Sequence, residues 1–166
     1  MPLQPGLLSA ESLGPGRGIE LESVVLDPVF PVFHKYYDDH PLGRVALYNR
    51  DRSAVSGVSV SLFVRQHMDA PRVLRTPELK PGKYREVELT ALFRDTILEV
   101  TEGTKVNAEL VLEYDLEGSR YQATRSETLR LLDRNAMTWE DDRKACAFVT
   151  AKDPSVLSFA KNVAGM

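Results

Sequence analysis

Residues 58–64 read VSVSLFV, an unbroken alternation of aliphatic residues with serine or phenylalanine. Successive side chains of a β-strand point to opposite faces, so this pattern predicts a strand with one buried face. The aliphatic residues would face a core and the others solvent. The predicted core-facing residues are Val58, Val60, Leu62 and Val64.

Residues 105–114, KVNAELVLEY, repeat the same period of two. The residues expected on the buried face are Val106, Ala108, Leu110, Leu112 and Tyr114. The sequence DLEGSR follows at 115–120, and its Gly118 can take the positive φ that a tight hairpin requires. We therefore expect residues 119–132 to return antiparallel to residues 105–115.

Further strands are predicted along the chain, with turn sequences such as HPLG, MDAP and LKPG between them. The stronger patterns cover residues 19–26, 44–49 and 84–93, and the weaker ones cover residues 32–37, 73–75 and 97–100. About seven to nine short strands without an intervening helix favour an all-β, two-sheet antiparallel sandwich. A closed barrel is the competing architecture.

Composition narrows the class of partner. The 166 residues include 24 acidic and 21 basic residues and carry a formal charge of -3. They form no basic stripe, which argues against nucleic acid as a partner. Residues 1–18 lack the basic start and long apolar run of a signal peptide, and no later stretch is long enough to span a bilayer. Because residues 1–18 are rich in Pro, Gly and Ser, we expect a flexible segment outside the fold.

Residues 133–166 lose the strand pattern and favour helix. Thr138 with Asp141 three residues later is typical of a helix start, and Asp153 with Pro154 is a second start. We expect a short helical extension whose apolar residues pack against a neighbouring domain. These residues are Trp139, Val156, Phe159, Ala160 and Val163.

Residues 34–40, HKYYDDH, hold the residues best suited to bind a metal. The candidate ligands are His34, Asp38, Asp39 and His40, which would suit a hard or borderline cation. Their spacing matches no known metal site, so we favour a solvated loop. The candidates for ligand binding are the nearby aromatic residues Phe33, Tyr36 and Tyr37. Because Pro28 and Pro31 favour an edge strand, we expect these aromatic rings to pack on the core.

No catalytic arrangement stands out in the sequence, and we expect a protein that is neither an enzyme nor dependent on a cofactor. Cys146 is the only cysteine, and no local motif provides it with a base. The acidic residues of WEDDR, residues 139–143, are explained by their position at a helix start.

The run LYNRDRSAVSGVSVSLFV at 47–64 resembles strands of bacterial Ig-like modules of the CARDB type, in which a polar N-x-(G/D) turn precedes a strand. The similarity extends through LKPGKYREVEL at 79–89 to the predicted hairpin. It implies an Ig-like sandwich over residues 19–132 and favours a bacterial envelope or periplasmic location. The disulfide cysteines of antibody domains are absent.

The sequence DRNAMTW at 133–139 resembles the segment that joins such a module to a transglutaminase-like domain in some large bacterial proteins. This resemblance implies that residues 133–166 are a connector. We therefore expect a non-catalytic spacer or protein-interaction module of a larger protein, whose partner is an adjacent domain or another protein. The alternative is a carbohydrate- or metal-dependent binding domain, for which Phe33, Tyr36, Asp38 and Asp39 would bind a glycan or calcium.

Overall fold

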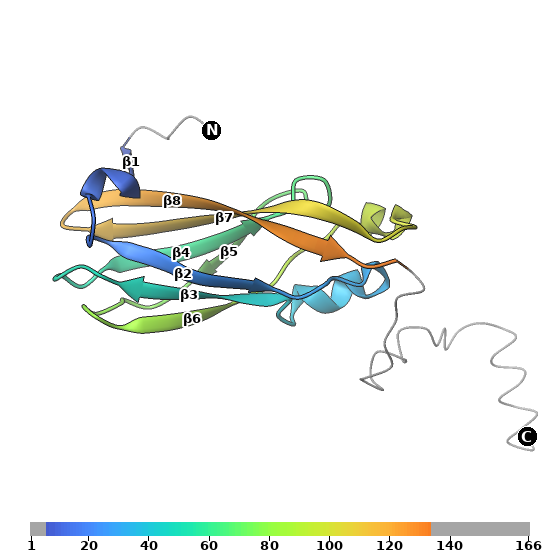
Figure 1. The fold of residues 1–166 in the computed structure, drawn as a ribbon, viewed down its shortest axis with the longest axis horizontal. Helices are drawn as coiled ribbons and strands as arrows, with labels where there is room; N and C mark the ends of the chain where they lie inside the picture. The colour runs from blue at the N-terminus through green and yellow to red at the C-terminus, as the bar shows by residue number, and fades with distance from the viewer. Residues whose placement is uncertain (1–5, 134–166) are drawn as a thin grey trace, which may run out of the picture. The chain divides into compact units, whose positions relative to one another are not determined.

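The computed structural model of the chain describes residues 6–133, which form two packed β-sheets (Figure 1). The five-stranded sheet has the order β1-β8-β7-β4-β5, and the three-stranded sheet has the order β2-β3-β6. The strands of the first sheet are β1 (Leu7–Ser9), β8 (Ser119–Leu131), β7 (Thr104–Leu116), β4 (Ser56–Phe63) and β5 (Arg72–Arg75). Those of the second are β2 (Ile19–Leu26), β3 (Gly43–Asn49) and β6 (Tyr84–Leu89).

The strand order confirms the predicted antiparallel Ig-like sandwich. In an Ig-like fold, strands A, B and E form one sheet and strands G, F and C form the other. Here β2, β3 and β6 occupy the A, B and E positions, and β8, β7 and β4 occupy the G, F and C positions. The remaining strand, β5, extends the second group beside β4 as a C′ strand does.

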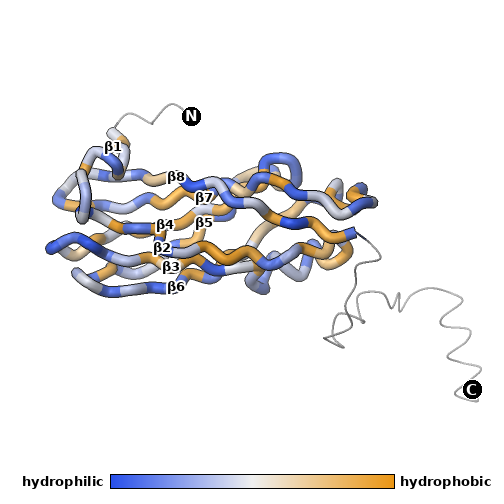
Figure 2. The backbone as a smooth tube through the Cα atoms, in the orientation of Figure 1, coloured by the Kyte–Doolittle hydropathy of each residue, from blue (hydrophilic) through white to orange (hydrophobic). Residues whose placement is uncertain are grey.

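Alternating burial explains why these segments are strands. All four predicted core residues of 58–64 are at most 1% exposed, and those of β7 are at most 9% exposed. Figure 2 shows apolar stretches along strands of both sheets, and the buried side chains from the two sheets form one core. The hairpin is also confirmed, because Leu116 pairs with Ser119 across Glu117 and Gly118, which both have positive φ.

Three short 3-10 helices join the strands, and two of them correct predicted strands. They are η1 (Ala10–Leu13), η2 (Pro31–Asp38) and η3 (Asp95–Glu99). The predicted strands at 32–37 and 97–100 are therefore wrong. Pro31 occupies the first turn of η2, where its fixed φ and missing N–H favour a helix start over an edge strand. The strand predicted to reach residue 93 ends at Leu89.

The start of the chain also corrects a prediction, because residues 7–13 belong to the fold. β1 pairs in parallel with β8 from Arg120 to Gln122, and η1 follows it directly. A three-residue strand carries too short a pattern to recognise, and its partner lies more than a hundred residues away. The predictions for Cys146 and for the helical segment at 133–166, apart from residue 133, lie outside the described residues. Within residues 6–133, no helix has the length and apolar character needed to cross a bilayer.

Candidate binding surface

The predicted metal ligand His34 holds two 3-10 helices together. Its side chain is buried, with Nδ1 3.1 Å from the carbonyl oxygen of Pro31 and Nε2 3.0 Å from Oδ1 of Asp95. Asp95 also forms an ion pair with Lys35, with Nζ and Oδ1 3.0 Å apart. Hydrogen bonds from Lys35 and His34 lower the pKa of Asp95. Both ring nitrogens of His34 therefore have protein partners, which fasten η2 to η3.

The other predicted metal ligands do not gather around His34. The ring of His40 stacks on Tyr36 with 3.8 Å between ring centroids, and its Nδ1 lies 3.1 Å from the carbonyl oxygen of Tyr36. Asp39 is exposed at the end of η2, whereas Oδ1 of Asp38 is buried without a hydrogen-bond partner. Among residues 6–133, no three His, Cys, Asp or Glu side chains converge in a way that could hold a metal ion.

The predicted aromatic candidates have two different environments. Phe33 is buried and lies against Phe30, with 5.2 Å between ring centroids. The half-buried Tyr37 accepts a hydrogen bond from the Phe30 N–H at 3.2 Å and packs edge-on against Phe93, and burial raises its pKa. Tyr36 is 45% exposed. Phe33 and Tyr37 thus contribute to packing at this end of the sandwich, and only Tyr36 is open to a ligand.

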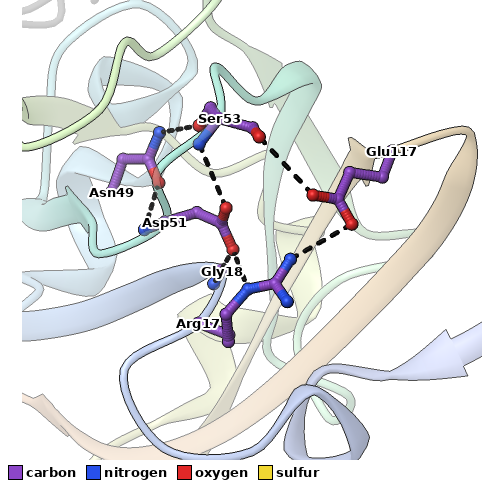
Figure 3. A network of polar contacts seen from close by, with 6 residues as sticks. All are labelled: Arg17, Gly18, Asn49, Asp51, Ser53 and Glu117. Atoms are coloured by element: carbon purple, nitrogen blue, oxygen red, sulfur yellow. Dashed lines mark hydrogen bonds and ion pairs between the residues drawn. The ribbon is translucent and has the colours of Figure 1, made fainter.

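A buried polar network at the opposite end of the sandwich was missed from the sequence (Figure 3). Asn49 is fully buried, and its Nδ2 donates to the carbonyl oxygens of Ser53 at 3.0 Å and Leu79 at 2.8 Å. Its Oδ1 accepts from the N–H of Asp51 at 2.8 Å. Asn49 thus fixes the β3–β4 loop against the segment that precedes β6, which gives the N-x-D turn of the sequence a structural role.

Asp51 is the centre of this network. Its side chain is 1% exposed, and Oδ2 accepts from Arg17 Nε at 2.6 Å and from the Gly18 N–H at 3.1 Å. Oδ1 accepts from the Ser53 N–H at 3.1 Å. Burial acts to raise the pKa of Asp51, but the hydrogen bonds from these three donors outweigh it and lower the pKa. Because protein groups fill the network, we assign it the structural role of joining β2 to the β3–β4 loop.

The four sheet edges differ in how open they are. An unpaired edge exposes N–H and C=O groups that can bind another strand, and proteins commonly protect such edges. β1 covers β8 at one end, and Val29 forms a bridge with Leu131 at the other. Between them Arg125, bonded to Glu127, donates from Nη1 to the Leu21 carbonyl oxygen on β2 at 3.1 Å. The β2 and β8 edges are thus partly closed, and β2 is also interrupted by a bulge after Leu21.

The remaining two edges belong to β5 and β6. β5 has four residues and lies between Pro71 and Pro77, which cannot donate to a neighbouring strand. β6 has six residues, and its pairing with β3 runs without a register shift from Gly43 to Tyr48. β6 is therefore the longest regular edge that no other strand of residues 6–133 covers.

Exposed side chains give the β6 edge a distinct chemistry. Tyr84 is 63% exposed and stacks on Tyr48 of β3, with ring centroids 4.3 Å apart. Arg50 lies over the Tyr48 ring at 5.5 Å and forms an ion pair with Glu20, so one row runs across the sheet. A hollow of about 110 Å³ lies further along β6, lined in part by three acidic residues and one basic residue. These four are Asp27, Arg44, Glu86 and Glu88.

Together these features make the β6 edge the best candidate for a binding surface. It combines open backbone hydrogen-bonding groups, an exposed aromatic face and an excess of carboxylates. Such an edge can bind an extended peptide. No protein-family model matches the sequence, and a search of curated proteins finds no match.

Proposed function

We propose that the chain is a non-catalytic Ig-like module of a larger bacterial protein, where it spaces or docks protein partners. The observation that carries this proposal is that the described chain starts and ends at opposite ends of the sandwich (Figure 1). Leu7 pairs with Arg120 beside the hairpin turn, whereas Leu132 donates to the Val29 carbonyl oxygen at the far end of β8. Modules with this arrangement can be joined in series.

The length and regularity of the central hairpin favour a fixed spacing. β7 and β8 pair without interruption over 13 residues each. At about 3.3 Å per residue, β8 separates the two ends by about 36–40 Å. The core holds both sheets against this hairpin, so the ends are expected to keep their distance. The partner would be an adjacent domain or another protein.

The alternative, a carbohydrate- or metal-dependent binding domain, receives less support from the residues proposed for it. Phe33 is buried, and Asp38 and Asp39 do not converge with a third ligand within the described part of the chain. Tyr36 is exposed, but its ring stacks on His40. A surface role for other proteins therefore agrees better with the placement of these side chains.

Pulsed electron-electron double resonance on the full chain tests the proposed spacing. Spin labels would replace the exposed Leu8, beside β8, and the exposed Arg130, near its far end, in a Cys146→Ser background. The β8 strand from Tyr121, which pairs with Leu8, to Arg130 spans about 30 Å at about 3.3 Å per residue. We expect one narrow distance distribution near this value, allowing for the label arms. A broad distribution would contradict a spacer, and singly labelled samples control for contacts between molecules.

A further inference from the structure

We propose that the β6 edge binds an extended segment of a protein partner, with basic side chains at the positions opposite Glu86 and Glu88. This inference rests on the proposed function, because it assumes a module that recognises proteins. It adds the surface and the chemistry of the partner. β6 is an edge strand of the three-stranded sheet, and added strands commonly bind at such edges through main-chain hydrogen bonds.

The pairing of β6 with β3 shows which backbone groups are open. The Asn49 N–H donates to the Lys83 carbonyl oxygen at 3.1 Å, so odd-numbered residues here direct their backbone groups toward β3. Backbone groups alternate in direction along a strand. The N–H and C=O groups of Tyr84, Glu86 and Glu88 therefore point to the open edge, where they provide three donors and three acceptors for an added strand.

The side chains beside these groups set the sequence of the partner. Directly opposite residues on neighbouring strands have Cβ atoms about 4.5–5.5 Å apart, where opposite charges attract. Arg44 reaches Glu86 only at 3.9 Å, and Asp27 and Glu88 lie around the same hollow. With three carboxylates around one guanidinium, this part of the edge favours Lys or Arg opposite Glu86 and Glu88.

Tyr84 and Arg85 extend the match to neighbouring positions. The row formed by Arg50, Tyr48 and Tyr84 ends at the edge, so an aromatic or Arg residue opposite Tyr84 would continue the stacking. Arg85 and Val87 face the other side of the sheet, where an acidic and an apolar residue would suit them. Read antiparallel to β6, the preferred segment is Lys-Val-Lys-Glu-Tyr.

A second copy of this chain does not fit the same edge. Two β6 strands related by a two-fold axis pair antiparallel and keep outward side chains on one face. A register centred on Arg85 places two arginines opposite each other, one centred on Glu86 places two glutamates opposite each other, and one centred on Val87 pairs Glu86 with Glu88. Like charges at directly opposite positions destabilise a strand pair. The charges therefore favour a different polypeptide.

The experiment is a titration of the full chain with a labelled peptide that contains Lys-Val-Lys-Glu-Tyr between Gly-Ser flanks. Fluorescence anisotropy measures affinity, and amide shifts in the NMR spectrum locate the peptide. We expect saturable binding that weakens with salt and shifts the amide signals of Tyr84, Glu86 and Glu88. A peptide with proline in place of the second lysine cannot donate its N–H there, so it should bind at least tenfold more weakly.

Charge reversal provides the matched test. In the double variant Glu86→Lys and Glu88→Lys, affinity for the basic peptide should fall at least tenfold, and a Glu-Val-Glu-Lys-Tyr peptide should now bind. The control variant Glu102→Lys and Glu109→Lys changes the formal charge equally, away from β6, and should retain the original affinity within twofold. Circular dichroism confirms that both variants fold.

Several outcomes would overturn the β6 proposal. These are no saturable binding of the basic peptide, equal binding of the proline peptide, or equal effects of the two double variants. An oligosaccharide that shifts the Tyr84 signal while the basic peptide does not would replace the peptide by a glycan and would also overturn it. A narrow spin-label distance together with failed peptide binding would leave the spacer function standing and refute only this edge.

Discussion

Replacing Asp51 with Asn should destabilise the sandwich by about 2–3 kcal/mol at pH 7. A carboxylate oxygen of Asp51 accepts from both Arg17 Nε and the Gly18 N–H, and the other accepts from the Ser53 N–H. Asn has the same shape but only one acceptor oxygen, so its amide group must face at least one donor. Hydrogen bonds to charged groups contribute about 1.5–3 kcal/mol each, and these bonds act on one site rather than adding independently.

The effect of Asp51 should depend on pH in a defined direction. Its pKa is lowered in the folded state, whereas in the unfolded chain it lies near the ordinary value of about 3.9. The stabilising contribution is therefore fully present above that value and is lost as the pH falls through the lower, folded pKa. The difference between the native chain and Asp51→Asn should be constant from pH 7 to about pH 5 and should shrink toward pH 3.

Urea unfolding followed by far-ultraviolet circular dichroism measures this difference. Glu117→Gln is the matched control, because Glu117 also contacts Arg17, at 3.2 Å, but its side chain is 61% exposed. An exposed ion pair contributes little, so this control should change stability by less than about 0.5 kcal/mol. The reasoning would be refuted if Asp51→Asn changed stability no more than the control, or if its effect at pH 3 equalled that at pH 7.

Three further predictions concern packing, backbone conformation and metal binding. Leu110→Ala, at a fully buried site of β7, should lower the free energy of unfolding by about 2–5 kcal/mol, whereas Ser126→Ala on exposed β8 surface should change it by less than about 0.5 kcal/mol in urea titrations. Gly57→Ala should cost more than Gly82→Ala, because both glycines have positive φ but only at Gly57 would the added Cβ overlap a carboxylate, that of Asp115; melting temperatures that agree within 1 °C would refute this. Millimolar calcium should leave the melting temperature unchanged, since the predicted metal ligands do not converge within residues 6–133; a calcium-dependent rise would contradict that placement.

The strands that bury one face were predictable from the sequence. The alternation in residues 58–64 and 105–114 follows directly from burying every second side chain, and the bounds predicted for 19–26 match β2. Gly118 identified the turn because a two-residue hairpin requires positive φ. These signals are local, so a single sequence contains them in full.

Features that depend on distant residues were not predictable in the same way. η2 is held through His34 and Asp95, which lie 61 residues apart, and its aromatic residues suggested an edge strand. Burial of Asp51 depends on Arg17, 34 residues earlier. The open β6 edge becomes visible only with the strand order, because YREVEL reads like any half-buried strand. Candidate ligands close in sequence, such as His34 and Asp38, diverged for the same reason.

The mass of the native protein tests the central claim, that this sandwich is a module of a larger protein, most directly. An antibody raised against residues 6–133 would be used to immunoblot extracts of the cells that produce the chain, with cells lacking the gene as a control. The account predicts a band well above the 18.6 kDa of this sequence. A single band at that mass would contradict the account.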